Sequence, residues 1–454
     1  MYPKLYKNIL FPFYETFLRK RNTLKYLKYL EKTQWYSPER LREIQWERLQ
    51  RLLRYAYEDV PYYREKFKKL KLLPEDIKNF KDFEKFPILT KSDIRNNQKK
   101  LVAQNFKGKI FKTATGGSTG IPLQLKLDHN NYEWRQAAIK RVYGWAGYSD
   151  GEKTVFIWGG SVGKVSFWNE CKHQIDEWLK RHKIYNTFYF KEKSMKRYIK
   201  DINRYKPKFI IAYTSPLYNF ARFIKENNKR VYSPQSIIVA AEKLFNYQRK
   251  LIEEVFGCPV FETYGCREVT SIAGECEFHQ GMHINMENIY LEIVKDGKSA
   301  NPGEMGEIVI TDLTNYCMPL IRYKNEDVGT LSEKQCPCGR GLILLESVEG
   351  RILDVIKTPD GKIVPGEFFP HLFKEFEDID KFQIIQEDLD NLKVKIVKRD
   401  SFSEKDFNLL KKEIFKVMGK GININFLFVD DIPLTKTGKF RVVVSKVPIN
   451  FGNR

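Results

Sequence analysis

The chain has 454 residues, 42% of them hydrophobic, which is too long for one ordinary compact core, so we expect two or three folding units. Its seven cysteines lack the dense spacing of a small disulfide-bonded domain, which argues against a disulfide scaffold and for a reducing compartment. The formal net charge of +22 indicates an affinity for anions. However, basic runs mix with acidic and apolar residues and no nucleic-acid-binding motif is present, so we expect no nucleic-acid partner.

The first residues of the chain are apolar, aromatic and basic. Residues 1–14 are interrupted by lysines and two prolines, so they are too short and too broken to span a bilayer. The segment ends in Leu18-Arg19-Lys20-Arg21, and such a segment suits an anionic membrane interface. The alternative is a segment that packs on the protein's own body. We therefore expect a cytoplasmic protein, and the membrane alternative places it peripherally at the inner face.

Residues 1 to about 100 have the pattern of helices. The clearest start is Ser37-Pro38-Glu39, where Ser can cap, Pro fits the first turn and Glu favours the positive end of the helix dipole. One apolar stripe follows it at helical spacing: Leu41, Ile44, Leu49, Leu52, Leu53 and Ala56. This part is predicted to be a helical extension.

Residues from about 100 to 345 alternate between strand and helix patterns. Strand-like runs at 154–157, 209–212 and 237–240 are separated by helical stretches such as 132–145, which predicts an α/β arrangement. Runs at 289–294 and 307–311, joined through Asn301-Pro302-Gly303, predict antiparallel strands that follow it.

The pattern changes again after Gly350-Arg351. A hairpin is predicted from 382–385 and 392–397, then a helix at 407–417 and a strand at 422–429. The predicted fold is therefore α/β, with a large N-terminal domain over 1–349, including the helical extension 1–100, and a small C-terminal α+β domain over 350–454.

The stretch Thr113 to Pro122 reads TATGGSTGIP, with three glycines and four hydroxyl groups in ten residues. Glycines let successive backbone N–H groups approach an anion, and the hydroxyls add donors, so the loop suits phosphate. It is not a Walker A motif, because the last glycine is followed by Ile-Pro instead of Lys-Ser/Thr. The alternative is an ordinary Gly/Ser/Thr-rich surface turn.

Further motifs accompany this loop in order along the chain. They are AAEKL at 240–244, YGCRE at 264–268, RYKNED at 322–327, Gly350-Arg351, and PLTKTGKFR at 433–441. This set resembles the adenylate-forming enzymes, and within them the phenylacetate-CoA ligase group and its CapK-like capsular polysaccharide biosynthesis members. The N-terminal sequence at 31–35, 37–39 and 60–64 resembles that subgroup too, so the resemblance covers nearly the whole chain.

The resemblance implies an ATP-dependent ligase in which a carboxylate attacks the α-phosphate of ATP, expels pyrophosphate and forms an acyl-adenylate. The cofactors it implies are ATP and Mg²⁺, and coenzyme A is one candidate acceptor. The protein's task is then to position the reactants and to neutralise charge.

The resemblance also implies a role for each matching residue. The β- and γ-phosphates would be held by Thr115, Gly116, Gly117, Ser118 and Thr119. Tyr264 would stack on the adenine, Ala241 and Glu242 would border the base, and Gly265 next to Tyr264 would belong to the same cofactor site. Asp327 with Arg351 would bind the ribose. Glu268 would bind Mg²⁺, and Lys439 would bring an ammonium group to the reacting carboxylate and α-phosphate.

The catalytic lysine belongs to a different predicted domain from the phosphate loop. The resemblance implies that the small domain is mobile and rotates about Gly350-Arg351 to bring Lys439 in and out. Two departures from the family pattern stand out. The first is at the hinge: Leu353 stands where an acidic residue or lysine is common, and Asp354 follows only at the next position, so the residue about which the domain rotates is not identified. The second is in the phosphate loop, where Ala114 replaces a hydroxyl residue.

A second constellation points to a metal. Cys276 and His279 form a Cys-x-x-His pair, and Cys336 and Cys338 form a Cys-x-Cys knuckle followed by glycine. Together they could supply a Cys₃His set for structural Zn²⁺, as in some members of the family, with His283 as a rival fourth ligand. The alternative is free thiols in loops. The other cysteines, Cys171, Cys258, Cys266 and Cys317, are interpreted as packing residues.

The acid and the acceptor are open. The acid pocket is expected near 213–217 and 158–161, where aromatic and small residues mix. The substrate would be a small-molecule or sugar carboxylic acid, and the acceptor an amine, a hydroxyl or a thiol. The resemblance favours surface polysaccharide biosynthesis, with an aryl- or acyl-CoA ligase as the first rival. The second rival is a catalytically silent membrane-surface scaffold, against which Lys439, Glu268 and Asp327 argue.

Overall fold

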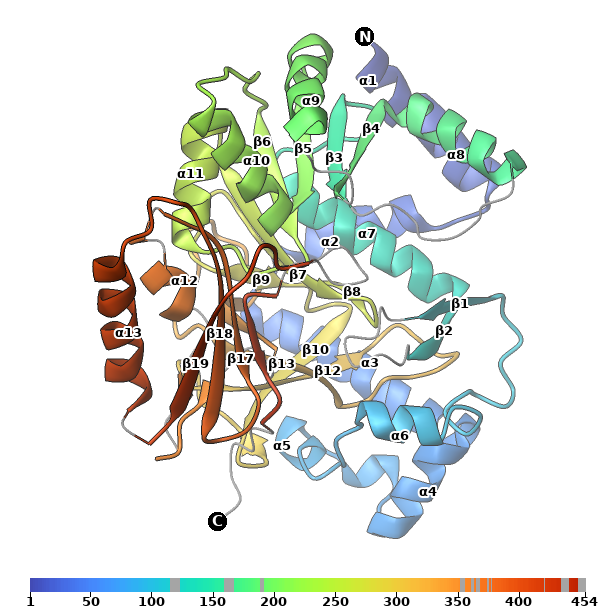
Figure 1. The fold of residues 1–454 in the computed structure, drawn as a ribbon. Helices are drawn as coiled ribbons and strands as arrows, with labels where there is room; N and C mark the ends of the chain where they lie inside the picture. Colours follow the sequence, from blue (N-terminus) through green and yellow to red (C-terminus); the bar gives the residue numbers. More distant parts are fainter. Residues whose placement is uncertain are drawn as a thin grey trace.

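A computed structural model of the chain is shown in Figure 1. It describes all residues except 115–122, 159–166, 188–191, 352–355, 361–362, 365–367, 374, 377, 420, 434–440 and 448–454. Thr115, Gly116, Gly117, Ser118 and Thr119 of the predicted phosphate loop therefore lie outside the described residues, as do the predicted catalytic Lys439, Leu353 with Asp354, and 159–161 of the predicted acid pocket.

The N-terminal part is helical, as its pattern predicts. Its elements are α1 (Tyr2–Leu5), η1 (Tyr6–Leu10), η2 (Phe13–Leu18), α2 (Thr23–Thr33), α3 (Pro38–Asp59), α4 (Pro61–Leu70), η3 (Pro74–Asp76), α5 (Phe80–Phe83) and α6 (Lys91–Asn96). The Ser37 hydroxyl accepts a hydrogen bond from the Arg40 backbone N–H at 3.3 Å, which confirms the predicted start of α3. The predicted apolar stripe of α3 is buried, and all of it except Ile44 joins the largest hydrophobic cluster among the described residues.

The central region is a parallel sheet covered by helices. The strands are β3 (Thr154–Trp158), β4 (His182–Asn186), β5 (Phe209–Tyr213), β6 (Ser236–Ala240) and β7 (Val260–Cys266). The helices are α7 (His129–Trp145), α8 (Phe167–Lys180), α9 (Glu192–Tyr205), α10 (Thr214–Glu226) and α11 (Asn246–Phe256). The strands pair in the order β4-β3-β5-β6-β7, all parallel, and every residue of β5 is buried. These runs of β-branched residues are continuous because both faces of a parallel sheet are covered.

An antiparallel half continues the same sheet. Its strands are β8 (Thr270–Glu275), β9 (Met282–Ile284), β10 (Ile289–Lys295), β11 (Lys298–Ser299), β12 (Met305–Asp312), β13 (Tyr323–Leu331) and β14 (Leu344–Arg351). The whole sheet has twelve strands in the order β11-β10-β12-β13-β14-β9-β8-β7-β6-β5-β3-β4. The pairing of β10 with β12 confirms the two antiparallel strands predicted there. A separate hairpin, β1 (Ile110–Ala114) with β2 (Gln124–Asp128), flanks the predicted phosphate loop.

The C-terminal part forms its own core. Its elements are β15 (Ile356–Lys357), β16 (Ile363–Val364), α12 (Phe368–Phe373), β17 (Ile379–Gln386), β18 (Asn391–Lys398), α13 (Glu404–Met418), β19 (Asn423–Phe428) and β20 (Val443–Ser445). The sheet order is β19-β18-β17-β20, and α13 packs its buried face into the same cluster. The predicted hairpin, helix and strand of this unit are confirmed.

Four charged side chains join the two units. Arg222 and Glu226 lie on α10, and Asp380 and Arg399 belong to the C-terminal unit, which stands beside α10 and α11 in Figure 1. Arg399 pairs with Glu226 at 2.8 Å and with Asp380 at 2.9 Å, and Arg222 pairs with Asp380 at 3.3 Å. We call this group the interdomain ion-pair cluster.

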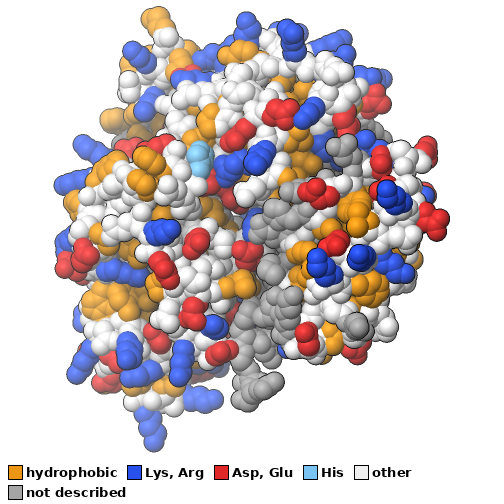
Figure 2. Space-filling model, turned by 90° about the vertical axis from the view of Figure 1, so that its left-hand side faces the viewer, with side chains coloured by type: hydrophobic (Ala, Val, Ile, Leu, Met, Phe, Trp, Pro, Cys, Tyr) orange, Lys and Arg blue, Asp and Glu red, His pale blue; other side chains and the backbone are white. Residues whose placement is uncertain are grey.

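The charge of the molecule is dispersed on the face seen in Figure 2. Lys and Arg side chains there alternate with acidic and hydrophobic ones and form no continuous basic groove. Among the described residues, no helix combines the length and the apolar character needed to cross a bilayer.

Candidate functional site

The carboxyl ends of the parallel strands bring several predicted site residues to one edge of the sheet. β3 ends at Trp158, β5 at Tyr213 and β6 at Ala240, and these strands are neighbours in register. The rings of Trp158 and Tyr213, both predicted to border the acid pocket, lie 4.1 Å apart between centroids. Because ligands of open α/β sheets bind at the carboxyl ends of the strands, this edge is the candidate active site.

The turn after β6 carries the first predicted adenosine contacts. Ala241 has a φ of 73°, in the left-handed region that few residues other than glycine adopt. The turn directs the Glu242 carboxylate to the start of α10, where it accepts a hydrogen bond from the Ser215 backbone N–H at 2.8 Å. The Glu242 carbonyl oxygen also accepts from the Thr214 hydroxyl at 3.0 Å. The sharp bend is thus fixed by the helix that follows β5.

Tyr264, on β7, is held by residues of β13. Its hydroxyl donates to Asp327 Oδ2 at 2.6 Å, and the Asn325 amide donates to the Tyr264 oxygen and to Asp327 Oδ2, each at 2.7 Å. Burial and the Asp327 charge raise the pKa of Tyr264 well above its ordinary value, which keeps its hydroxyl protonated. The structure therefore brings together the predicted adenine platform and the predicted ribose ligand, 63 residues apart in sequence.

Asn325 is a member of this cluster that the sequence analysis did not single out. It stands two residues before Asp327 on β13, where Glu326 has a φ of 72° and the pairing with β12 is irregular. The Asn325 side-chain oxygen accepts a hydrogen bond from the Asp327 backbone N–H at 3.1 Å, which holds the two residues together. The only signal in the sequence that could have indicated Asn325 was its position two residues before Asp327 within the RYKNED motif.

Arg351 lies opposite Asp327. The two are paired residues of the antiparallel strands β13 and β14, so the backbone places the predicted ribose pair side by side. Two residues before Arg351, Glu349 forms an ion pair with Lys243 at 2.7 Å. This pair connects β14 to the turn after β6.

Gly265 follows Tyr264 at a β-bulge between β7 and β8. A Cβ atom at this position would lie 1.9 Å from the carbonyl oxygen of Thr270, so the close approach of the two backbones requires glycine. The glycine thus fixes the turn that positions Tyr264 on one side and Glu268 on the other.

Glu268 sits behind this turn and is only 6% exposed. Its Oε1 accepts a hydrogen bond from the Tyr323 hydroxyl at 2.8 Å, and its carbonyl oxygen accepts from the Arg135 guanidinium. Burial and the neighbouring Glu268 carboxylate raise the pKa of Cys266 well above its ordinary value, which keeps this thiol protonated and a poor nucleophile.

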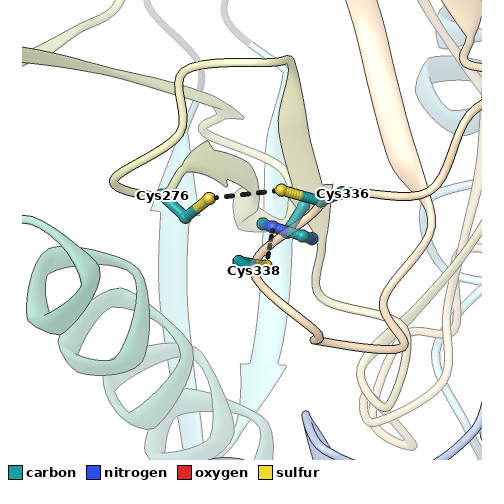
Figure 3. Close-up of side chains that lie close together, drawn as sticks. Cys276, Cys336 and Cys338 are labelled. Atoms are coloured by element: carbon teal, nitrogen blue, oxygen red, sulfur yellow. Dashed lines mark hydrogen bonds between the residues drawn. The ribbon is translucent and has the colours of Figure 1, made fainter.

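The metal-ligand candidates converge at the other end of β8. The ligand atoms of Cys276, His283, Cys336 and Cys338 all lie within 4.8 Å of one another. Figure 3 shows Cys276 facing Cys336, with the two sulfurs 3.5 Å apart, and Cys338 beside them. Cys338 Sγ lies 3.3 Å from His283 Nε2. Ligands of a tetrahedral zinc, with bonds of about 2.0–2.3 Å, stand about 3.3–3.8 Å apart. The Cys276–Cys336 and Cys338–His283 distances fall in this range.

The structure corrects the fourth member of this set. His279 lies elsewhere: its Nδ1 stands 3.2 Å from a Glu275 carboxylate oxygen and 3.3 Å from Arg249. His283 replaces it because β9 pairs with β14, which places His283 opposite Leu344 and next to the Cys336–Cys338 knuckle. Burial lowers the pKa of His283 to about 4, so its imidazole is neutral, the form that binds metal.

The remaining described cysteines agree with a packing role. Cys258 and Cys317 are buried, and burial raises the pKa of Cys258 to about 12. The Cys171 side chain lies outside the described part of the structure.

The chain is similar in sequence to known proteins over most of its length. A family model described as the CapK C-terminal domain matches residues 356–446. Protein CapK of Staphylococcus aureus is 26% identical over 436 residues, which cover 95% of this chain and 94% of that protein. A phenylacetate-coenzyme A ligase of Thermus thermophilus is 26% identical over 394 residues, which cover 83% and 86% of the two chains. This chain is a homologue of Protein CapK and of the phenylacetate-coenzyme A ligases. The resemblance inferred from the motifs is thereby confirmed.

Solved structures show the same fold. A 2-hydroxyisobutyryl-CoA ligase in its postadenylation state matches with a TM-score of 0.70 at 20% identity, covering 90% of each chain. The same protein in its thioesterification state matches with a TM-score of only 0.59. An anthranilate CoA ligase matches with a TM-score of 0.53 at 16% identity, covering 75% of this chain and 67% of that one. The predicted α/β fold with a small C-terminal domain is confirmed.

Proposed function

We propose that this chain is an ATP-dependent carboxylate ligase of the adenylate-forming type. A carboxylate oxygen of the substrate attacks the α-phosphorus of ATP, the bond to the β-phosphate breaks, and pyrophosphate leaves. The acyl-adenylate then reacts with a nucleophile at its carbonyl carbon, AMP leaves, and the nucleophile loses a proton. Homologues and structural neighbours named as CoA ligases support this proposal over nearly the whole chain.

The cluster of Tyr264, Asp327 and Asn325 carries the proposal. An aromatic face with its hydroxyl tied to a carboxylate, at the carboxyl edge of a parallel sheet, suits a nucleoside: the ring offers a stacking face and Asp327 offers acceptors to ribose hydroxyls. Arg351, opposite Asp327 on the next strand, completes the proposed ribose site. Ala241, Glu242 and Gly265 form the turns around the base.

The phosphates and their counter-charges complete the assignment. Thr115, Gly116, Gly117, Ser118 and Thr119 would hold the β- and γ-phosphates, and the β1–β2 hairpin supports both ends of that loop. Bound Mg²⁺ would neutralise phosphate charge, with Glu268 as its proposed ligand; the bond from Tyr323 orients that carboxylate. Lys439 would stabilise the charge that develops between the carboxylate and the α-phosphate. We also propose that Cys276, His283, Cys336 and Cys338 hold a structural Zn²⁺.

The homology to Protein CapK favours an acid and an acceptor from surface polysaccharide biosynthesis. The proposed substrate is a small-molecule or sugar carboxylic acid, and the acceptor an amine or a hydroxyl. Transfer to the thiol of coenzyme A is the second candidate, favoured by the homology to phenylacetate-coenzyme A ligases. The proposal includes a peripheral contact of the N-terminal segment with an anionic membrane.

ATP–pyrophosphate exchange tests the first step. The assay is run over aryl, fatty, amino and uronic acids, and we expect one class to support exchange. Lys439→Ala should lower the exchange rate by about 10²–10³, because a charge-stabilising donor is lost. Lys436→Ala, three residues earlier in the same segment, is the matched control and should retain the rate. Exchange that Lys439→Ala leaves unchanged would falsify the assigned role.

The acceptor is tested in a second experiment. The purified acyl-adenylate complex is offered coenzyme A in one reaction and an amino sugar in another. Release of AMP with the amino sugar supports the polysaccharide assignment. Release with the thiol alone supports the coenzyme A ligase instead.

A further inference from the structure

The N-terminal segment has two faces. Tyr6, Phe11 and Glu15 are buried on one face, where Lys140 lies 4.3 Å above the Phe11 ring and Glu15 accepts a hydrogen bond from the Thr23 hydroxyl at 2.8 Å. This face holds the segment on the protein body. Of the two alternatives considered from the sequence, the structure shows the packing on the protein's own body, and this packing uses only one face of the segment.

The opposite face is apolar and exposed. Leu5, Ile9, Phe13 and Phe17 recur every fourth residue, so they line one side of the helical segment. Phe17 is 71% exposed, and Leu18 beside it is also exposed. Four consecutive apolar positions on one open face exceed the scattered exposure that is normal for a soluble surface.

A second helix extends this face. α8 runs beside α1 in Figure 1, and the Tyr2 hydroxyl donates to the Leu179 carbonyl oxygen at 2.5 Å. On α8, Ile175, Trp178 and Leu179 are exposed at positions i, i+3 and i+4, and Trp178 is 75% exposed. Two segments far apart in sequence thus expose their apolar stripes on neighbouring surfaces. We call these seven residues and Leu18 the apolar end patch.

The charges around the apolar end patch are basic. Lys4, Lys7, Arg19 and Lys20 are exposed along the N-terminal segment, and its one acid, Glu15, is buried and paired with Arg21. On the described part of α8, Asp176 pairs with Lys180 and Glu177 with His182. Glu15, Asp176 and Glu177 are therefore each paired with a basic side chain, whereas several Lys and Arg side chains of the N-terminal segment face solvent.

We propose that the apolar end patch is a docking surface for an anionic lipid bilayer. Phe, Trp and Leu side chains enter the boundary between headgroups and acyl chains, and the surrounding Lys and Arg side chains pair with anionic headgroups. A protein partner or a second copy would bury the apolar residues equally well, but the exposed cations flanking the patch match an anionic surface and would oppose an identical copy. This inference rests on the membrane contact included in the proposed function and names the surface that makes it, whereas the proposed ligase activity does not depend on it.

Vesicle co-sedimentation of the full chain tests this proposal. The probes are phosphatidylcholine vesicles with and without about one third phosphatidylglycerol. We expect binding to the anionic vesicles only, and a marked loss of binding at about 0.5 M salt because screening removes the headgroup attraction. Phe17→Ser with Trp178→Ser should weaken binding about tenfold or more.

Matched controls keep the outcome interpretable. Leu409→Ser removes a similarly exposed apolar side chain, 50% exposed, from α13 in the other unit and should leave vesicle binding unchanged. Lys4→Glu with Lys20→Glu should weaken binding without removing an apolar group. Equal binding of the wild-type and patch variants would overturn the proposal. A concentration-dependent dimer that the patch variants abolish, without any vesicle binding, would overturn it in favour of self-association.

Pyrophosphate exchange is measured on the same variants. The altered residues lie away from the strand ends that form the candidate active site, so exchange in solution should persist. Loss of vesicle binding with intact exchange therefore separates the docking surface from the catalytic site.

Discussion

At the scale of single residues, Glu262 shows how burial near the candidate site changes a side chain's chemistry. It lies two residues before Tyr264 on β7, and its carboxylate accepts a hydrogen bond from the Leu244 backbone N–H at 2.8 Å. Burial, together with the negative charge of Glu275, raises the pKa of Glu262 to about 7. Between the ordinary pKa of 4.5 and this value, the folded protein holds a proton that the unfolded chain has released.

This difference predicts a pH dependence of stability. Because the native state binds the extra proton, the contribution of Glu262 to the free energy of unfolding falls as pH rises from about 4.5 to about 7, by at most about 3 kcal/mol. Glu262→Gln removes the titration and keeps an acceptor for Leu244. Its stability relative to the wild type should therefore be greater at pH 8 than at pH 5, by up to this amount, in urea unfolding. A difference that is constant between the two pH values would contradict the assignment.

Single residues also mark the limit of sequence reasoning. The family resemblance implied that Asp327 and Tyr264 contact the nucleotide, and the structure joins their side chains at 2.6 Å. It did not give Asn325, whose amide binds both, because this contact joins β7 and β13, two strands that are not paired and that only the folding of the whole sheet brings together.

At the scale of elements, local signals were enough for most helices and strands. The start of α3 was predictable because a Ser cap and a Pro in the first turn act within one turn of helix. The histidine that joins the three cysteines was not predictable. His279 and His283 are both near Cys276 in sequence, and the register of β9 against β14 decides which one meets Cys338.

The metal set predicts a specific pair of outcomes. The purified protein should hold about one Zn²⁺ per chain. His283→Ala should lose the ion and lower the melting temperature, because the ion links β8, β9 and the loop before β14. His279→Ala, the matched control outside the set, should retain it. The measurement is metal analysis of chelator-free preparations beside thermal unfolding. Clearly substoichiometric zinc, or loss in the His279 variant alone, would refute the site.

At the scale of the whole molecule, the interdomain ion-pair cluster connects the two units. Arg399 bridges Glu226 on α10 and Asp380 on β17, and these two carboxylates raise the pKa of Arg399 well above its ordinary value, so the pairing favours its charged form. If the small domain rotates, these pairs must break.

Reversing one charge tests the cluster. Exposed ion pairs contribute about 0–1 kcal/mol each, so Arg399→Glu should shift the balance of domain arrangements by a few-fold rather than abolish one of them. We expect lower energy transfer between dyes on α10 and α13, and a smaller effect of salt on that transfer than in the wild type. The double variant Glu226→Arg with Arg399→Glu restores one pair with reversed charges and should recover part of the signal. Transfer that is identical in the wild type and in Arg399→Glu would show that other contacts hold the units.

The sequence by itself determined the elements, the α/β fold with its small C-terminal unit, and the homology to Protein CapK and the phenylacetate-coenzyme A ligases. These depend on local propensity, on periodicity and on short motifs, all of which are written within a few residues of one another. The tertiary structure decided which distant residues meet: Tyr264 with Asp327, His283 in place of His279, and the N-terminal stripe beside α8. Strand register and the packing of one helix face settle such meetings, and both depend on the whole chain at once.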